Sequence, residues 1–282
     1  MTSTGTVLDE IIAGVREDLE HRRRAVGEDT LRRLADQVDP ARDAVGALRG
    51  DGRTMTLISE VKRSSPSKGS LAPIPDPAAL AHVYAQAGAN AISVLTEQRR
   101  FGGSLADLDA VRVQVSVPVL RKDFVVDPYQ VIEARAHGAD LVLLMASALD
   151  DDALRRLYDL VGELGMTALV EVHDGPELER ALRLEPRVIG VNARDLKTLQ
   201  IDIERACELL RQVPAGPVAV GESAVHSVED VSSYARAGAD AVLVGEALVT
   251  AGDPAETVAA FRAVAREGRL TNMPQGSEEV SA

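Results

Sequence analysis

One short motif occurs three times along the chain, and its central copy reads His137-Gly138-Ala139-Asp140-Leu141-Val142. The other copies are Ala87-Gly88-Ala89-Asn90-Ala91-Ile92 and Ala237-Gly238-Ala239-Asp240-Ala241-Val242. In each copy the glycine can end a helix in the left-handed conformation, and an apolar strand starts within three residues. The motif therefore predicts a helix-to-strand connection that the chain uses repeatedly.

Apolar runs of strand type extend this repeat to eight units. Val, Ile and Leu dominate the runs, and each is followed by a segment with helical periodicity, which argues for a parallel sheet covered by helices. The runs lie at 55–62, 91–96, 117–124, 140–147, 166–172, 187–193, 217–222 and 240–245. They predict an α/β fold, a single closed (β/α)8 TIM barrel. A doubly wound open sheet is the alternative, but no Gly-rich turn follows the first strand.

The residues before the first strand form an addition to the barrel. Residues 6–37 carry an apolar stripe at helical spacing, beginning with Val7, Leu8 and Ile11, and we expect them to be helical. The expected domain is a barrel over residues 1–268 with an N-terminal helical extension of about residues 1–50. Apolar periodicity is lost from Gly268, which predicts a disordered C-terminal tail over 269–282.

Composition excludes several classes of partner. The formal net charge of −13 and the absence of Trp disfavour nucleic-acid binding by phosphate contacts or base stacking. No run of about 18 apolar residues and no signal peptide are found, so no membrane partner is expected. The single cysteine, Cys207, fits a reducing cytoplasm and lies in a helical pattern, where a small buried side chain is expected. An anionic small molecule remains possible if lysines and arginines cluster locally.

Polar residues occur where the predicted strands end, the place where barrel enzymes build their sites. Glu60 and Lys62 end the first strand two residues apart, so they share one face. The later strand ends contribute Lys122 with Phe124, Glu171, Asn192 with Arg194, and Glu222 with Ser223. Each one alone could be a solvated strand end, but together they favour an active site. Lysines and glutamates around one cavity shift each other's pKa values, which suits acid–base catalysis.

Two glycine-containing segments end the last two strands, Gly221-Glu222-Ser223-Ala224 and Val244-Gly245-Glu246-Ala247. Their backbone N–H groups could bind a phosphate, as in many barrels, although glycine also permits a tight turn. The parallel positions favour phosphate binding. The five histidines, His21, His82, His137, His173 and His226, are scattered and supply no ligand pair, so no metal is expected.

Several motifs occur in a fixed order along the chain: Glu60-Val61-Lys62-Arg63-Ser64-Ser65-Pro66-Ser67-Lys68-Gly69, Leu120-Arg121-Lys122-Asp123-Phe124, Leu169-Val170-Glu171-Val172, Gly190-Val191-Asn192-Ala193-Arg194-Asp195-Leu196, Thr198, Asp202, Gly221-Glu222-Ser223 and Val244-Gly245-Glu246. Together they resemble the indole-3-glycerol phosphate synthase family over roughly residues 5–265. The resemblance implies a lyase of tryptophan biosynthesis. It would close the ring of 1-(2-carboxyphenylamino)-1-deoxyribulose 5-phosphate with loss of CO2 and water, without metal or organic cofactor.

The resemblance also implies roles for individual residues. Lys122 looks like the acid of ring closure, while Glu171, Glu60 and Lys62 look like the groups that handle the remaining protons, in a division the sequence leaves open. The implied catalytic set is Glu60, Lys62, Lys122, Glu171, Asn192 and Ser223. The implied substrate-binding set is Ser65, Phe101, Phe124, Leu143, Arg194 and Glu222, with Phe101, Phe124 and Leu143 as an apolar wall that could also be ordinary core. The implied phosphate-binding set is Lys62, Ser223, Ala224, Gly245 and Glu246.

Glu246 departs from family members that carry Ser at this position. Its carboxylate is expected to point away from an anion, so only its backbone N–H is assigned. The rival functions are another phosphate-binding barrel, such as phosphoribosylanthranilate isomerase, and a barrel that binds a phosphorylated metabolite without catalysis. Glu60-Val61-Lys62 argues against the first, and the pair Lys122 and Glu171 argues against the second. We expect a monomer or weak homo-oligomer.

Overall fold

A computed structural model of the chain describes residues 5–195 and 198–268. The tail expected at 269–282 lies outside these ranges. Within them, no helix combines the length and the apolar character needed to cross a membrane.

Eight strands of the described chain form a closed parallel barrel, as the repeat predicts. In spatial order they are β1 (Thr56–Val61), β10 (Ala241–Val244), β9 (Val218–Glu222), β8 (Val188–Asn192), β7 (Thr167–Val172), β6 (Leu141–Met145), β5 (Val119–Lys122) and β4 (Ala91–Leu95). The barrel closes because β1 pairs in parallel with both β10 and β4. A separate two-stranded hairpin, β2 (Ser64–Ser65) with β3 (Gly69–Ser70), lies in the connection after β1.

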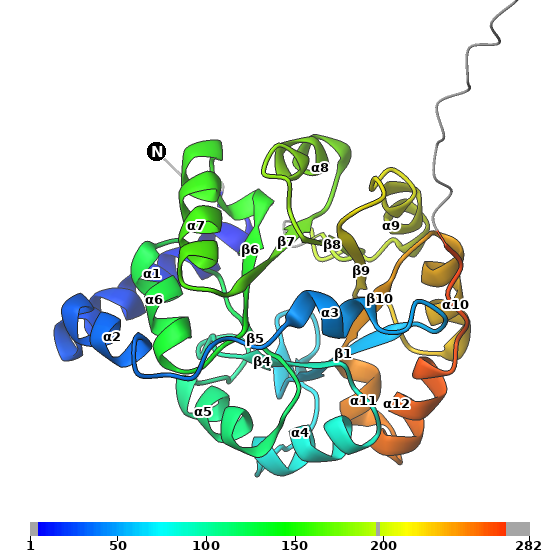
Figure 1. Cartoon of the computed structure of the whole chain (residues 1–282), viewed down its shortest axis with the longest axis horizontal. Helices are drawn as coiled ribbons and strands as arrows, with labels where there is room; N and C mark the ends of the chain where they lie inside the picture. Colours follow the sequence, from blue (N-terminus) through cyan, green and yellow to red (C-terminus); the bar gives the residue numbers. More distant parts are fainter. Residues whose placement is uncertain (1–4, 196–197, 269–282) are drawn as a thin grey trace, which may run out of the picture.

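Helices surround the strands (Figure 1). Those that follow the barrel strands are α4 (Pro77–Gln86), α5 (Leu105–Gln114), α6 (Pro128–Ala136), α7 (Asp151–Glu163), α8 (Gly175–Leu182), α9 (Ile203–Leu210), α10 (Val228–Arg236), the short α11 (Glu246–Thr250) and α12 (Pro254–Arg262), with a 3-10 turn, η1 (Ala146–Ala148), before α7. Most begin at an Asp or Ser whose side chain accepts a backbone N–H of the first turn, as Asp150 does from Ala153.

The N-terminal extension contains three helices, α1 (Val7–Ala25), α2 (Glu28–Ala35) and α3 (Ala44–Arg49). Residues 6–37, which were expected to be helical, form the two helices α1 and α2 with a break between them. Val26 is extended, with φ −133° and ψ 113°, and Gly27 is the N-cap of the second helix. Helix α3 closes the amino end of the barrel, where the Thr56 hydroxyl donates to the carbonyl of Leu48 at 2.7 Å. In Figure 1 it lies over the strands near the centre of the barrel.

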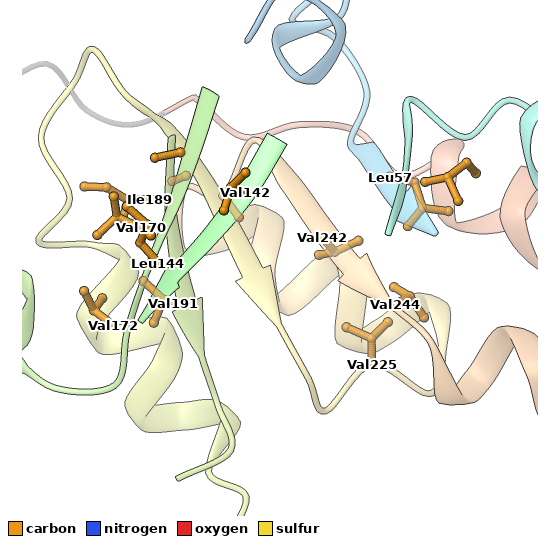
Figure 2. Packing of buried hydrophobic residues seen from close by; sticks show 14 of the residues in the cluster. Leu57, Val142, Leu144, Val170, Val172, Ile189, Val191, Val225, Val242 and Val244 are labelled. Carbon is orange, nitrogen blue, oxygen red and sulfur yellow. The ribbon is translucent and has the colours of Figure 1, made fainter. Parts of the chain in front are cut away.

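Alternation along each strand separates two apolar regions. Ile58 and Leu120 belong to the interior of the barrel, which α3 also joins through Leu48. Leu57 belongs to the layer between strands and helices. Figure 2 shows neighbouring residues of this outer layer, which pair across β7 and β8 as Val170 with Ile189 and Val172 with Val191. Because side chains alternate along a strand, the residues that end each strand on the inner face point into the mouth of the barrel.

The repeated motif has a structural explanation. Its glycines adopt positive φ, 103° at Gly88, 75° at Gly138 and 89° at Gly238, as expected for the left-handed end of a helix. The residue two positions later joins neighbouring strands. Asp140 accepts the backbone N–H of Val119 at 2.8 Å, Asp240 accepts that of Ala219 at 2.8 Å, and Asn90 accepts that of Leu57 at 3.1 Å. The motif thus fastens each strand to the strand before it in sequence at the amino end of the barrel.

Candidate active site

A cavity opens at the carboxyl ends of the barrel strands, with about 960 Å³ of space that includes its mouth. Every residue expected in the site lines it. These are Glu60, Lys62, Ser65, Phe101, Lys122, Phe124, Leu143, Glu171, Asn192, Arg194, Glu222, Ser223, Ala224, Gly245 and Glu246. The barrel thus brings together residues that lie up to 186 positions apart in the sequence, from position 60 to position 246.

Lys122 lies among three buried carboxyl groups. Its Nζ is 3.4 Å from Glu222 Oε2, 3.6 Å from Glu171 Oε2 and 3.9 Å from Glu60 Oε2. The three glutamates come from β9, β7 and β1, and none is more than 2% exposed. Buried charges are unfavourable unless they are paired. One ammonium therefore has to balance several carboxyl groups.

This cluster moves pKa values in opposite directions. Burial disfavours the ammonium of Lys122, but the carboxylates of Glu222 and Glu171 outweigh burial and raise its pKa. Burial also disfavours the Glu171 carboxylate, yet Lys122 and His173 lower its pKa. Burial and the neighbouring Glu171 raise the pKa of Glu222 well above its ordinary range. The cluster therefore keeps Lys122 charged. A proton bound by the carboxyl groups of Glu171 and Glu222 resides on Glu222 rather than on Glu171.

Glu60 and Lys62, which share one face as their spacing predicts, form an ion pair beside this cluster. Lys62 Nζ lies 2.7 Å from Glu60 Oε1, and the Ser93 hydroxyl donates to Glu60 Oε2 at 3.3 Å. Burial opposes the charge of Glu60, but Lys62 and Lys122 lower its pKa. The site thus contains two lysine ammonium groups within reach of the same carboxylate.

Two glycines make room for the carboxyl groups. A Cβ at Gly190 would lie 2.0 Å from Glu222 Oε1, and a Cβ at Gly245 would lie 2.7 Å from Glu60 Oε1. Gly190 belongs to β8, where its role was not foreseen from the sequence. Gly221 differs from the expectation, because it does not line the cavity and its missing Cβ leaves space for the ring of Tyr234, 2.5 Å from the position of that Cβ. Packing, and not the approach of an anion, explains this glycine.

The turn after β9 has a strained backbone. Ser223 and Ala224 have φ of 66° and 55°, a left-handed conformation that costs energy for residues other than glycine. Such strain is common at functional sites. Both residues line the cavity next to Gly245, at the end expected to bind phosphate.

Polar contacts hold the connection after β1 across the cavity mouth. Arg194 Nη1 donates to the Ser67 hydroxyl at 2.8 Å, and Lys68 pairs with the carboxylate of Glu246. Burial opposes the Glu246 charge, but Lys68 lowers its pKa. The Glu246 carboxylate was expected to point away from an anion. In the structure it binds Lys68 of the facing loop, while Glu246 itself lines the cavity.

The opposite wall is apolar, as expected. The rings of Phe101 and Phe124 lie 6.0 Å apart at 43°, and Leu143 is 3% exposed within the interior apolar cluster. Leu95 and Met145 extend this wall. An aromatic ring of a ligand would fit against these side chains.

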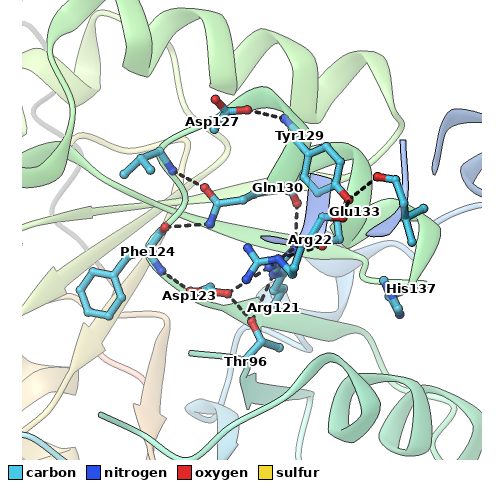
Figure 3. Close-up of polar contacts among 12 residues, drawn as sticks. Arg22, Thr96, Arg121, Asp123, Phe124, Asp127, Tyr129, Gln130, Glu133 and His137 are labelled. Carbon is cyan, nitrogen blue, oxygen red and sulfur yellow. Dashed lines mark hydrogen bonds and ion pairs between the residues drawn. The ribbon is translucent and has the colours of Figure 1, made fainter. Parts of the chain in front are cut away.

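A buried network behind the cavity fixes the backbone around Lys122 (Figure 3). Arg121 points away from the cavity, is fully buried, and pairs with Asp123 at 3.0 Å and Glu133 at 2.9 Å. Asp123 in turn accepts the backbone N–H of Phe124 at 2.8 Å, and the Gln130 side chain donates to the Phe124 carbonyl at 2.9 Å. These contacts hold Lys122 and Phe124 in place. Nothing in the sequence pattern indicated that an arginine at this position would be buried.

The sequence also did not place His173 in the site. Its Nε2 lies 3.4 Å from Glu171 Oε1, and the residue is 7% exposed. The signal that could have found it is its position two residues after Glu171, the spacing that joins Glu60 with Lys62. Over the described ranges, no group of three or more His, Cys, Asp or Glu side chains is arranged to hold a metal ion.

The fold and the cavity define a class: an enzyme of the (β/α)8 type, with an acid–base cluster at the carboxyl ends of its strands. Comparison with known proteins agrees. Residues 8–261 match the family model of indole-3-glycerol phosphate synthase. The indole-3-glycerol phosphate synthase of Parafrankia sp. is 58% identical over 252 residues, covering 89% of this chain and 93% of that protein. The chain belongs to the indole-3-glycerol phosphate synthase family.

Other comparisons are consistent with this assignment. Indole-3-glycerol phosphate synthase 1 of Streptomyces coelicolor is 57% identical over 253 residues, with 90% of this chain and 93% of that protein covered. A crystal structure of 3-hexulose-6-phosphate synthase from Salmonella typhimurium aligns with a TM-score of 0.61 at 18% identity, covering 74% of this chain and 97% of the other. At 18% identity, the similarity to 3-hexulose-6-phosphate synthase concerns the fold alone.

Proposed function

We propose that the cavity converts 1-(2-carboxyphenylamino)-1-deoxyribulose 5-phosphate into indole-3-glycerol phosphate, CO2 and water. The observation that carries this proposal is the position of Lys122 among three carboxyl groups, in a chain of this family. The enzyme is then a carboxy-lyase of tryptophan biosynthesis. Its acids and bases are side chains of the protein, and no cofactor takes part in the proposed steps.

Lys122 is the acid of the first step. The aromatic carbon that bears the carboxylate attacks the ketone carbon, a C–C bond forms, and the ketone oxygen takes up a proton. Lys122 remains charged in the free site, because three carboxyl groups lie within 3.9 Å of its Nζ. The developing alkoxide is more basic than an amine, so the proton moves from Nζ to oxygen as the bond forms.

The later steps need a second acid and a base. Loss of CO2 leaves its bonding electrons in the ring and restores aromatic conjugation. The new hydroxyl then leaves as water with a proton from an acid, and a base removes a proton from the neighbouring carbon. The ion pair of Glu60 and Lys62 provides one base and one acid 2.7 Å apart, and Glu171 supports the charge of Lys122. Asn192 and Ser223 hold polar groups of the intermediate.

The substrate lies across the cavity with its two ends in different surroundings. Its carboxyphenyl ring packs against Phe101, Phe124 and Leu143, and Arg194 and Ser65 contact its anionic or hydroxyl groups. Its phosphate binds at the other end, formed by Lys62, Ser223, Ala224, Gly245 and the N–H of Glu246. Support for this orientation comes from the cavity lining, which is apolar at Phe101 and Phe124 and polar at the turns after β9 and β10.

One chain suffices for this site, since all residues with a proposed role line one cavity of one chain. We therefore propose that the protein acts as a monomer or weak homo-oligomer, in the cytoplasm. Sedimentation over a range of protein concentrations measures the first point. An activity that required a dimer at every concentration would contradict it.

The proposed function is tested by following indole fluorescence after addition of the carboxyphenylamino-deoxyribulose phosphate. One CO2 should be released for each indole formed, and EDTA should leave the rate unchanged because the proposed acids and bases are side chains. No fluorescence, or release of CO2 without indole, would contradict the proposal. A rate that fell with EDTA would contradict the metal-free mechanism.

A further inference from the structure

His173 joins the active site to an acidic side chain outside it. The residue follows β7, and its Nε2 lies 3.4 Å from Oε1 of Glu171. On the other side of the ring, Nδ1 lies 3.0 Å from Oε2 of Glu177, the same oxygen that accepts the backbone N–H of His173 at 2.9 Å. The imidazole thus lies between two carboxyl groups that are both buried.

The contacts determine where the protons of this ring are. An ionised carboxylate can only accept hydrogen bonds, so Nδ1 carries a proton toward Glu177. If Nε2 carried none, its lone pair would face an oxygen lone pair of Glu171. That arrangement is stable only with a proton on Nε2 or on Glu171. The first choice makes His173 an imidazolium between two anions.

Charged groups around the ring favour the imidazolium. Helix α8 contributes Glu177 and the residue before its first turn, Asp174, and Asp195 lines the same small cavity beside the ring. The cation that lines this cavity, Arg205 of α9, donates to the carbonyl of His173 at 3.1 Å, and not to the ring. Beyond Glu171 lie Lys122 and Glu222. Burial opposes the charge of His173, but Glu171 and Glu177 outweigh it and raise its pKa to about 10.

This arrangement distinguishes two carboxyl groups that otherwise share one lysine. Glu171 and Glu222 both lie within 3.6 Å of Lys122 Nζ. Glu171 has a second cationic neighbour in His173, whereas both oxygens of Glu222 lack a hydrogen-bond partner in the described part of the chain. The carboxyl group with two cations ionises first, and the other keeps the proton.

We propose that His173 is a positioning residue that keeps Glu171 ionised and directs the shared proton of the two carboxyl groups to Glu222. The proposal rests on the proposed role of this cluster in ring closure. His173 touches neither the substrate nor the reacting atoms in this scheme; it acts through Glu171. Glu177 is the outer anion that keeps the imidazole protonated and oriented.

The test is the pH dependence of kcat/KM for His173→Gln. Gln is neutral at every pH, so Glu171 loses one of its two cations, and its pKa rises toward that of Glu222. We expect the acidic limb of the profile to move upward by at least about one pH unit, the usual effect of removing an opposite charge at this distance. At high pH, where Glu171 is ionised again, kcat/KM should return to within about threefold of the wild-type value.

Two further variants control the test. Glu177→Gln removes the outer anion and leaves His173 in place, so the acidic limb should move in the same direction by a smaller amount. His137→Gln breaks a similar histidine–carboxylate pair, the contact of 2.7 Å between His137 and Asp109 on the surface, and should leave the profile unchanged. Loss of activity by the same factor at every pH in His173→Gln would indicate a packing role and overturn the proposal.

A second readout does not depend on activity. Nitrogen NMR shifts of the imidazole, assigned by comparison with His173→Gln, should show both ring nitrogens of wild-type His173 protonated at pH 8. A neutral ring at that pH would overturn the proposal even if the variants fold poorly. If instead the wild-type protein formed no indole, the proposed function would fail while the NMR result still decided the state of His173.

Discussion

The two ends of the barrel contain acidic side chains in opposite conditions. At the amino end, Asp140 accepts backbone N–H groups from Val119 and Arg42, each at 2.8 Å, and pairs with Arg112. At the carboxyl end, both oxygens of Glu222 and one of Glu171 have no hydrogen-bond partner among the described residues. The same chemical group is satisfied at one end and left short of partners at the other.

This difference separates stability from catalysis. Burial raises the pKa of Asp140 as well, but the backbone N–H groups of Arg42 and Val119 oppose that rise. These hydrogen bonds hold Asp140 in place, and the one from Val119 joins strands β5 and β6, so the contribution of Asp140 is to folding.

Glu222 lies near Lys122 but accepts no hydrogen bond from the described residues, and burial and Glu171 raise its pKa well above its ordinary range. Its ionised form therefore opposes folding, while its proton can be exchanged with a substrate. We infer that the carboxyl groups at the amino end stabilise the barrel. Those at the carboxyl end lower the free energy of unfolding and serve catalysis instead.

The largest effect on activity is expected from Lys122→Ala. The change removes the proposed acid, and kcat should fall by about 10²–10⁴-fold. Indole fluorescence measures the rate, and calorimetry measures whether indole-3-glycerol phosphate still binds. Turnover close to that of the wild type would remove Lys122 from the acid role.

The largest effect on stability is expected from the amino end, with Asp140→Ala. The change leaves Arg112 and two backbone N–H groups without their buried acceptor, and the free energy of unfolding should fall by about 3–5 kcal/mol. Urea unfolding followed by circular dichroism measures it. At temperatures where the variant is folded, kcat should stay within about threefold of the wild-type value.

Asp140→Asn is the matched control for this change. The first copy of the motif has Asn90 at the same place, where its side-chain oxygen accepts the N–H of Leu57 at 3.1 Å and contacts Arg262. An amide therefore suits the position, and we expect this variant to lose less than half as much stability as Asp140→Ala. Equal losses would show that the hydrogen-bonded acceptor is not what fastens the strands.

The smallest effect is expected at the cavity mouth, with Lys68→Met. Lys68 pairs with Glu246, but half of its side chain is exposed, and ion pairs of this kind contribute about 0.2–1 kcal/mol. Thermal unfolding should hardly change. KM should rise by no more than about fivefold, because the loop loses one of its contacts with the facing turn, and a loss of kcat would contradict this minor role.

The barrel and most of the site could be predicted from the sequence, for physical reasons. Strands that are buried on both faces are mostly apolar, so runs such as the one at 140–147 stand out. The barrel also fixes which residues meet, since the residue that ends each strand faces the mouth. Positions in the sequence alone therefore assign four polar residues to one cavity: Glu60, Lys122, Glu171 and Asn192.

Other features depend on contacts that a sequence does not display. Arg121 is buried because Glu133 of α6 and Asp123 happen to lie beside it. The imidazolium that we infer for His173 depends on Glu171 and Glu177, which lie on the two sides of its ring. The break between α1 and α2 at Val26 is accompanied by a tertiary contact, in which the Tyr129 hydroxyl donates to the carbonyl of Val26 at 2.9 Å. Glu133 and Tyr129 are distant in sequence from the residues that they contact, whereas Asp123 and Glu177 are near in sequence but meet their partners only in the folded chain.

The central claim, that the carboxyl end gives up stability for chemistry, is tested most directly on one variant, Glu222→Gln. In the wild-type protein, folding raises the pKa of the Glu222 carboxyl, so the free energy of unfolding should decline as pH rises above the ordinary range of glutamate. The amide of the variant does not titrate and should show no such decline. At pH 4 the two proteins should be equally stable. At pH 8 we expect Glu222→Gln to gain about 0.5–2 kcal/mol in the free energy of unfolding and to lose activity in the same preparation. A variant less stable than the wild type at pH 8 would contradict the account, because Glu222 would then stabilise the barrel as Asp140 does.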